Sequence, residues 1–287
     1  MTAGRFCVLV NSSDRARDIF EIVFQNSDRM WARCDWPRFA GFTTAHPDLY
    51  GFRSVAAKGS SDWRGELADQ LDELPPEIEY VLRLEEDALC LSPVDGQKLN
   101  RIAELMLRGN LAYVSLDPVS RSPVGRVVEY CRRRISKLPL RPISFKEPYY
   151  SAVVPAIWKR SYLRELLQNP GSIWVFEHIV TGERHYAVWE TVLDQDFLVT
   201  KGRWNWRAKR QLARQGLSLK NSKRQFQTPR SWLRGVRSKI SFMLFGYLSF
   251  RVRRHLNLLP GVPRDVIDNR NDSPRKKAGL DDKSKRI

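Results

Sequence analysis

The chain has few cysteines, and none of them are spaced as a pair. Its 287 residues include four cysteines, which lie far apart with no Cys-x-x-Cys spacing: Cys7, Cys34, Cys90 and Cys131. Cys7 and Cys90 stand inside apolar runs, so we expect reduced thiols that pack in the interior. The cysteine pattern therefore favours a reducing compartment over a disulfide-stabilised secreted protein.

A secretion signal is also missing from the sequence. Residues 1–5 lead directly into a short strand-like run at residues 6–10, with no long apolar region and no small-residue cleavage site. We therefore expect no secretion, and a cytoplasmic location. The content of 42% hydrophobic and 11% aromatic residues is enough for one large core, which excludes a disordered protein.

Acidic residues are scarce in only one part of the chain. Residues 1–200 hold 25 Lys and Arg against 27 Asp and Glu, whereas residues 201–287 hold 24 against 5, so the net charge of +17 comes entirely from the C-terminal part. The sequence thus predicts a near-neutral body with a basic extension. The partner of that extension is expected to be anionic: a membrane surface, a nucleic acid or a polyanionic substrate.

Strand-like and helix-like segments alternate through the body. Short apolar runs predict strands near residues 6–10, 41–44, 80–84 and 111–116, and helical patterns near residues 19–24, 63–74 and after Ser92-Pro93 separate them. Strands that alternate with helices imply a mainly parallel sheet. We expect one α/β domain over residues 1–205, a basic helical segment over 206–262 and a disordered basic tail over 263–287.

Three consecutive carboxylates, Glu85-Glu86-Asp87, follow the apolar run Tyr80–Leu84. Adjacent like charges at the end of a buried strand cost stability unless a cation compensates them. The carboxyl end of a strand in an open α/β sheet is where such folds bind ligands, and Mg²⁺ and Mn²⁺ prefer carboxylate oxygens. The triplet therefore predicts a binding site, although an acidic corner facing water is the alternative.

Several blocks of sequence together carry a resemblance to a known family. The first blocks are Gly59–Trp63 with its helix, Tyr80–Leu82 leading to Glu86-Asp87, and Ser92–Asp95; the later ones are Pro148–Ser151, Pro155–Arg160 and Trp174–Glu177. Over roughly residues 6–205 the chain resembles bacterial glycosyltransferase-like proteins encoded with surface-polysaccharide genes. Their fold is similar to the nucleotide-sugar-binding type called GT-A.

The resemblance implies a glycosyltransferase of lipopolysaccharide, capsule or other surface-polysaccharide assembly. It would take a nucleotide sugar as donor and a glycan or lipid-linked acceptor. Where metal-dependent members of this fold carry Asp-x-Asp, this chain has Glu85-Glu86-Asp87, so a requirement for Mn²⁺ or Mg²⁺ stays open. On this basis Glu86 and Asp87 are candidate metal ligands. The candidate donor-binding residues are Asn11, Ser61, Asp62, Trp63 and Glu85.

Glycosyl transfer also needs a base that deprotonates the acceptor hydroxyl. Glu177 is the candidate, because the apolar residues Trp174–Phe176 before it predict a half-buried setting that raises its pKa. The alternative is a surface acid, or an ion-pair partner of Arg160 or Arg184.

Each of the other candidates has a structural alternative. Ser61 and Asp62 can cap a helix, and Trp63 can pack in the core instead of stacking on a base. Trp158, a candidate sugar platform, is also a candidate core residue. His178 and His185 are expected to be polar surface histidines.

The basic segment 121–146 contains Arg133, a candidate ligand for the acceptor phosphates. A solvated loop is the alternative for this segment.

The basic extension has the pattern of an amphipathic helix that starts at Thr228-Pro229 and ends before Pro260. Its apolar positions are Trp232, Val236, Ile240, Met243, Leu244, Tyr247, Leu248 and Val252, and its arginines are Arg230, Arg234, Arg237, Arg253 and Arg254. The apolar run 240–250 reaches only roughly 16 Å of a ~30 Å hydrocarbon core. We expect it to lie on the inner face of an anionic membrane, or else to pack back on the body.

Two functions of other classes remain as alternatives. In a non-catalytic nucleic-acid-binding protein, the basic segment with Trp204, Trp206, Phe226 and Trp232 would contact phosphates and stack on bases. We regard nucleic acid as the weaker choice of partner. A nucleotidyltransferase of similar fold is disfavoured because the sequence has no glycine-rich phosphate loop.

Overall fold

The computed structural model describes residues 3–60, 62–117, 139–144, 150–153, 155–177, 179, 181–200, 202–219 and 224–228. All of them belong to one compact unit, Met1–Arg237. Ser61, Arg133, His178, the helix expected at 229–259 and the tail expected at 263–287 lie outside the described residues, so the predictions for them stay predictions.

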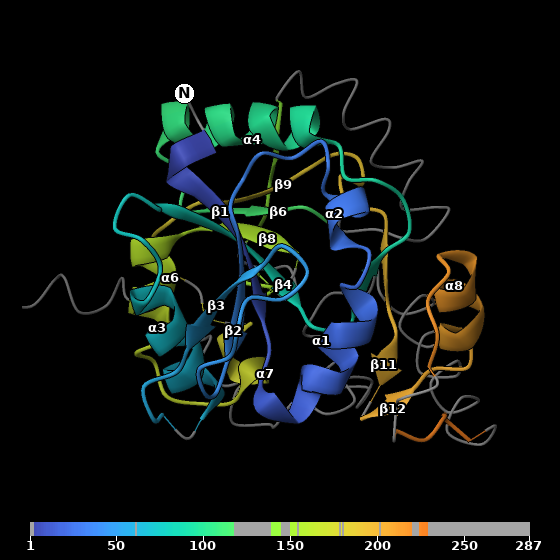
Figure 1. Cartoon of the computed structure of the whole chain (residues 1–287). Helices are drawn as coiled ribbons and strands as arrows, with labels where there is room; N and C mark the ends of the chain where they lie inside the picture. Colours follow the sequence, from blue (N-terminus) through green and yellow to red (C-terminus); the bar gives the residue numbers. More distant parts are fainter. Residues whose placement is uncertain are drawn as a thin grey trace, which may run out of the picture. The chain divides into compact units, whose positions relative to one another are not determined.

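A central sheet of eight strands organises the described part of the chain (Figure 1). Its strands are β1 (Phe6–Asn11), β2 (Arg38–Phe42), β3 (Arg53–Ala56), β4 (Tyr80–Glu85), β6 (Tyr113–Ser115), β7 (Arg141–Pro142), β8 (Ala156–Lys159) and β9 (His185–Ala187). Their order is β3-β2-β1-β4-β8-β6-β9-β7, and all but β7 and β8 run parallel. The prediction of a Rossmann-like α/β fold with a mainly parallel sheet is confirmed.

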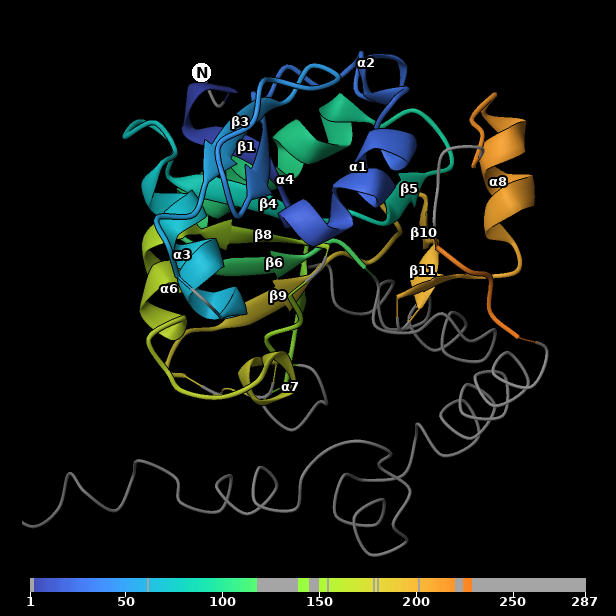
Figure 2. The same cartoon turned by 60° about the horizontal axis from the view of Figure 1, so that its bottom comes forward.

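Helices cover both faces of this sheet (Figure 2). They are α1 (Arg17–Val23), α2 (Ser27–Met30), α3 (Trp63–Asp72), α4 (Gly96–Gly109), α6 (Arg160–Leu166), α7 (Ile173–Phe176) and α8 (Ala208–Arg214). One hydrophobic cluster joins α1, α4 and α8 to one face, and a second joins α3, α6 and α7 to the other. Successive residues of β1 and β4 therefore enter different clusters, as the alternation of side chains along a strand requires.

Two small antiparallel sheets extend the structure beyond β4. The strand β5 (Ala88–Cys90) pairs with β10 (Gln195–Phe197), and β11 (Val199–Thr200) pairs with β12 (Arg203–Trp204). Because only a two-residue turn separates β4 from β5, the acidic triplet lies between the main sheet and these strands.

The elements predicted from sequence are present, with shifted boundaries. The strand expected at 41–44 is β2, which begins at Arg38, and the helix expected after Ser92-Pro93 begins at Gly96, after Asp95 caps it by accepting a hydrogen bond from the Lys98 amide (3.1 Å). The short strand β3 was not expected. The residues between Trp31 and Pro37 include the buried Trp31 and Trp36, so a stretch that reads as a loop still contributes to the core.

Cys7 and Cys90 are buried free thiols, as predicted, and Cys34 is partly buried. Burial raises the pKa of Cys90 to about 12 and that of Cys34 to about 11, so these thiols stay protonated near neutral pH. No helix among the described residues is long and apolar enough to cross a membrane.

Candidate active site

The candidate site lies where β1 and β4 end. Asn11 is the last residue of β1 and Glu85 the last residue of β4, and the two are partners in the parallel register. The carboxyl edge of an open parallel sheet is where α/β folds bind ligands. Two of the predicted donor-binding residues are therefore adjacent at this edge.

A buried arginine joins these two residues. The side chain of Arg83 is 1% exposed; its Nη2 donates to Oδ1 of Asn11 (2.8 Å), and its Nη1 lies 2.9 Å from Oε1 of Glu85. The Nε of Arg83 is buried and has no hydrogen-bond partner among the described residues. Since a buried charge needs compensation, Glu85 supplies the counter-charge that Arg83 requires.

The network continues into α3 through a glutamine. The Nδ2 of Asn11 donates to Oε1 of Gln70 (2.7 Å), and Gln70 is completely buried. A β-carbon on Gly41 of β2 would lie 2.1 Å from that same Oε1 atom. Glycine at this position therefore makes room for the amide of Gln70, which in turn orients Asn11.

Sequence reasoning missed Arg83 and Gln70, although each left a signal. Arg83 is the one charged residue inside the apolar run Tyr80–Leu84, and Gln70 stands three residues after Leu67 on the apolar face of its helix. A polar residue at a core position needs a partner in the interior, which is what each of them has.

Glu177 is brought to the same edge from a distant part of the sequence. It follows α7, and its Oε1 accepts a long hydrogen bond from the Val153 amide (3.4 Å). Burial raises the pKa of Glu177 to about 7; the charge of Glu85 raises this pKa further and the charge of Arg83 lowers it. The half-buried setting predicted from the residues before Glu177 is confirmed, and its role as a base stays a prediction.

Arg160 does not form the ion pair considered for Glu177. Its guanidinium donates instead to the carbonyl oxygens of Pro75 (3.0 Å) and Ile78 (3.3 Å). The Glu177 carboxylate is therefore influenced by Arg83, which the sequence did not indicate as its neighbour.

Glu86 and Asp87 form the turn between β4 and β5. The Oδ2 of Asp87 accepts a hydrogen bond from the Val199 amide (3.0 Å), and its carbonyl oxygen accepts one from the Leu198 amide (3.0 Å). Burial raises the pKa of Glu86 to about 7 and that of Asp87 to about 6, and the charge of Glu85 adds to both shifts. The turn thus contains two carboxyl groups whose pKa values are raised towards neutral pH.

The acidic side chains at this edge were predicted to bind a divalent cation. The described part of the chain contains no group of three or more His, Cys, Asp or Glu side chains arranged to hold a metal ion. One oxygen of Asp87 is engaged by the Val199 amide, and Glu85 is paired with Arg83. As arranged here, these side chains do not fit a Mg²⁺ or Mn²⁺ site, and the requirement for a divalent cation stays a prediction.

Asp62 and Trp63 begin α3 near the same edge. Asp62 caps the helix by accepting hydrogen bonds from the amides of Arg64 (3.0 Å) and Gly65 (2.8 Å). The half-buried Trp63 packs edge-on against Phe176, with ring centroids 5.5 Å apart. Both structural alternatives are therefore observed, and the packing on Phe176 places Trp63 against the residue that precedes Glu177.

The structure corrects the prediction for Trp158. Its side chain is completely buried in β8 and its indole N–H donates to the Val153 carbonyl oxygen (3.4 Å), so it has no free face for a sugar. The assignment to acceptor binding is wrong, and the core alternative is right.

The expectation of a surface position for His185 is also wrong. This residue is 1% exposed, and its ring nitrogens bond to the hydroxyl of Tyr162 (2.8 Å) and the carbonyl oxygen of Tyr150 (2.9 Å). Burial lowers the pKa of His185 to about 4, so the ring is neutral near pH 7.

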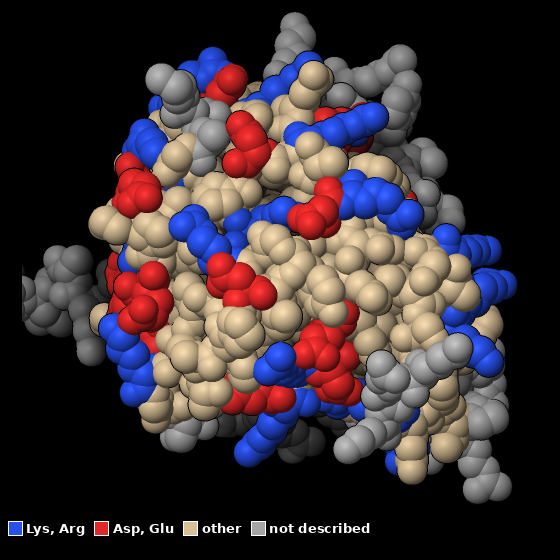
Figure 3. Space-filling model, in the orientation of Figure 1, with Lys and Arg blue, Asp and Glu red and all other residues tan. Residues whose placement is uncertain are grey.

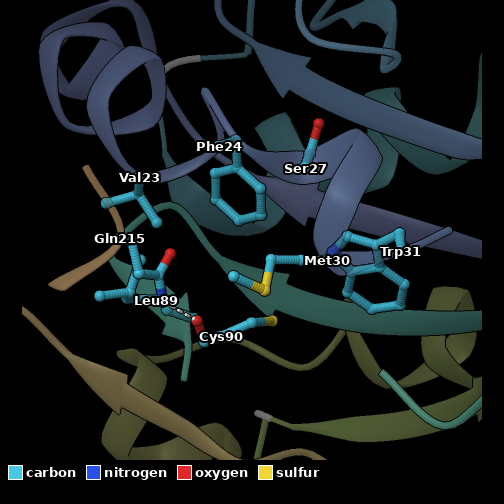
Figure 4. A pocket seen from close by; sticks show the side chains of 9 residues that line it. Val23, Phe24, Ser27, Met30, Trp31, Leu89, Cys90 and Gln215 are labelled. Carbon is cyan, nitrogen blue, oxygen red and sulfur yellow. Dashed lines mark hydrogen bonds between the residues drawn. The ribbon is translucent and has the colours of Figure 1, made fainter. Parts of the chain in front are cut away.

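A pocket on the opposite face of the sheet does not belong to the candidate site (Figure 4). Its volume is about 10 Å³, room for about one water molecule. It is lined by Val23, Phe24, Ser27, Met30, Trp31, Ala88, Leu89, Cys90 and Gln215. This pocket is too small for a sugar or a nucleotide, and it contains no residue of the Arg83 network.

No protein-family model matches the chain, and no curated protein matches it. Similar solved structures include S. aureus TarS (10% identity, TM-score 0.41, covering 66% of this chain and 36% of TarS) and its residues 1–349 (10%, 0.40, 66% and 59%). A cytidylyltransferase from Leptospira borgpetersenii serovar Hardjo-bovis also matches (13%, 0.32, 61% and 68%). This chain spans 36% of the length of TarS and 59% of the length of its residues 1–349. Likenesses of this size concern the general fold alone.

Proposed function

We propose that this protein is a glycosyltransferase that moves a sugar from a nucleotide-sugar donor to an acceptor in cell-surface glycan assembly. The observation that supports it best is that the Arg83–Glu85 pair at the carboxyl edge of the sheet lies close enough for both charges to influence the pKa of the half-buried Glu177. This edge combines a half-buried carboxylate with raised pKa, a buried cation and a second carboxylate. The resemblance of several sequence blocks to surface-polysaccharide glycosyltransferases supports the same reaction class.

In the proposed reaction, Glu177 takes the proton of the acceptor hydroxyl. That oxygen forms a bond to the anomeric carbon as the bond from this carbon to the donor diphosphate breaks, and the diphosphate leaves with the bonding electrons. A base with a pKa near the working pH suits this task. Arg83 would keep part of the Glu177 population ionised, because its charge lowers the pKa that burial raises.

The donor would lie along the edge formed by Asn11, Asp62, Trp63 and Glu85, as the sequence predicts. The amide of Asn11 is held between Arg83 and Gln70. A pre-oriented polar group costs less entropy on binding than a mobile one. The outcome at the anomeric carbon, retention or inversion, is a matter for product analysis.

The substitution Glu177→Gln tests this function most directly, because it keeps the shape of the side chain and removes its basicity. We expect transfer to fall by about 10²–10⁴-fold, the usual range for a general base, with donor affinity unchanged. The matched control is Glu165→Gln, an exposed glutamate on α6, which should retain full activity. Normal transfer by Glu177→Gln would place the base elsewhere.

A thermal-shift screen tests the substrate class. A nucleotide sugar that binds only the native state must raise the apparent stability, and repeating the screen with and without Mn²⁺ tests the metal prediction. A nucleotidyltransferase would instead respond to a nucleoside triphosphate and release diphosphate when a sugar phosphate is added.

We also propose that the enzyme acts at the inner face of a membrane, on a glycan or lipid-linked acceptor. The support is the sequence pattern of residues 229–259, which combines a wide apolar stripe with arginines at both ends. Arg133 and its basic neighbours would hold the acceptor phosphates in this arrangement.

A further inference from the structure

Two exposed aromatic side chains lie on adjoining backbone segments of the described chain, residues 203–214 and 224–228. Among the described residues, three large hydrophobic side chains are exposed: Leu91 (40%), Trp206 (48%) and Phe226 (42%). Trp206 and Phe226 belong to neighbouring backbone segments, since Phe226 forms a parallel bridge with Trp204, two residues before Trp206. Exposed large hydrophobic groups on one part of a surface commonly mark a site of interaction with a protein or a membrane.

Residues 203–214 are also strongly basic. The sequence contains no Asp or Glu between Asp196 and Asp265, and the guanidinium of Arg207 lies over the ring of Trp206, 5.2 Å from its centroid. Figure 3 shows basic side chains gathered where α8 lies, and no acidic side chain of the described residues lies beside them in this view. The exposed cations of this segment are Arg203, Arg207, Lys209, Arg210 and Arg214.

This segment is anchored on the body. Trp204, Ala208 and Leu212 are completely buried and belong to the hydrophobic cluster that covers the α1 and α4 face of the sheet. The Asn26 side chain also donates to the carbonyl oxygen of Gln215 (2.7 Å), just after α8. The outward-facing aromatic and basic groups therefore stand on a fixed base, so their exposure is not a consequence of local unfolding.

We propose that the surface formed by Trp206, Phe226 and the exposed cations of residues 203–214 docks onto an anionic lipid bilayer. Aromatic rings enter the headgroup region, and Lys and Arg are attracted to anionic lipid. This surface goes beyond the proposed transfer reaction, because it assigns a lipid contact to the folded body itself.

The adjoining segment of the chain favours lipid over a polynucleotide as the partner. Four residues after Gln225 the sequence enters the amphipathic segment that begins at Pro229, and this segment contains the apolar run 240–250. A bilayer can bury such a run, whereas the phosphate backbone and bases of a nucleic acid offer no comparable apolar volume.

The test is flotation of the full-length protein with vesicles of phosphatidylcholine, alone or mixed with phosphatidylglycerol. Two variants remove the two parts of the surface: Trp206→Ser with Phe226→Ser, and Arg207→Gln with Lys209→Gln and Arg210→Gln. Each cation near anionic lipid is worth about fivefold in binding, so the triple variant should bind mixed vesicles about 100-fold more weakly. The aromatic variant should lose at least about tenfold and keep its preference for anionic vesicles.

The matched controls change the same residue types elsewhere. Leu91→Ser removes the third exposed hydrophobic group, and Lys98→Gln with Arg101→Gln removes two exposed cations of α4. We expect both controls to bind mixed vesicles as the unchanged protein does. Only variants whose melting temperature matches that of the unchanged protein are compared. Transfer to a soluble acceptor should be the same in all of them. A loss of vesicle binding can therefore be distinguished from a loss of the proposed reaction.

Three results would overturn the docking surface. The first is vesicle binding unchanged in both surface variants, and the second is an equal loss in the α4 control, which would show a general charge effect. The third is a loss of binding to single-stranded DNA or RNA while vesicle binding is retained, which would identify a nucleic acid as the partner.

Discussion

The two ends of the acidic triplet have different surroundings. Glu85 ends β4 and pairs with the buried Arg83, whereas Asp87 lies two residues later in a turn and accepts a hydrogen bond from the backbone of Val199. Glu85 belongs to the edge near Glu177, and Asp87 holds the β11 segment against the main sheet. Three adjacent carboxylates in sequence therefore do not form one ligand set.

The difference arises from how a strand ends. Along a strand, successive side chains point to opposite faces, and a turn then redirects the backbone. Val81, Arg83 and Glu85 are alternate residues of β4 and so lie on the same face of the sheet. Val81 belongs to the hydrophobic cluster with α3, α6 and α7, so this is the face that those helices cover. The cation thus forms its ion pair with the member of the triplet that lies two residues away on its own face, and its charge is only the last of the influences on the pKa of Glu86 in the turn.

Replacing Arg83 should have the largest effect on the unfolding free energy among the substitutions at this edge. Arg83→Met leaves the Glu85 carboxylate without its buried partner, and removal of one member of a buried ion pair typically costs about 3–5 kcal/mol of unfolding free energy. Urea unfolding measures this loss. The pKa of Glu177 should also rise, so the acid limb of the transfer-versus-pH profile moves to higher pH.

The control for this experiment is Arg108→Met, which removes an exposed arginine of α4. It should change the unfolding free energy by less than about 0.5 kcal/mol. A similar small loss for Arg83→Met would mean that the buried pair with Glu85 does not stabilise the fold.

The turn should respond to pH in a defined direction. The pKa of Glu86 is raised by burial from 4.5 to about 7 in the folded state, so between these values the folded protein holds more protons than the unfolded chain. Its contribution to stability therefore falls as pH rises from 4.5 to about 7 and is constant above. At about 1.4 kcal/mol per pKa unit, Glu86→Gln should gain up to about 3.5 kcal/mol over the parent protein across this window.

Unfolding of both proteins at several pH values measures this difference. His185, whose pKa is lowered to about 4, contributes with the opposite sign, but it is present in both proteins and cancels in the comparison. A constant difference between Glu86→Gln and the parent protein over the window would contradict the raised pKa.

Gly41→Ala should disturb the hydrogen-bond network of Arg83, Asn11 and Gln70 and leave the turn at Glu86-Asp87 unchanged. The new β-carbon would lie 2.1 Å from Oε1 and 2.3 Å from Cδ of Gln70, so the amide that orients Asn11 must move. Overpacking of this kind costs about 1–3 kcal/mol of unfolding free energy. In a double-mutant cycle with Gln70→Ala the cost of Gly41→Ala should largely disappear; an additive result would show that the two side chains do not meet.

Two substitutions at Asp87 test the turn, and they should have the smallest effect on the unfolding free energy. Asp87→Asn keeps an oxygen that accepts from Val199, whereas Asp87→Ala removes it at a cost of about 1 kcal/mol. Stability measured by urea unfolding should therefore separate the two variants. A stable Asp87→Asn protein that loses transfer by orders of magnitude would show that the charge of Asp87 serves the donor, as the sequence-based assignment holds.

Local sequence patterns were enough to predict the helices α1, α3 and α4, several strands and the position of the acidic edge. β1, α1, α3 and β4 are encoded by runs with clear periodicity, and Asp62 stands where a helix cap is expected. Such elements depend on neighbours within a few residues, so a single sequence contains the information.

Which distant residues lie together depends on how the chain folds as a whole. Glu177 reaches the Arg83–Glu85 pair through the antiparallel insertion of β8 and the short helix α7, and Trp158 and His185 are drawn into the interior by the same insertion. Whether an indole or imidazole faces solvent depends on what packs over it, and no periodicity in its own segment reports this. Which carboxylate compensates the buried charge of Arg83 likewise depends on the fold around the end of β4, which is a property of the assembled sheet.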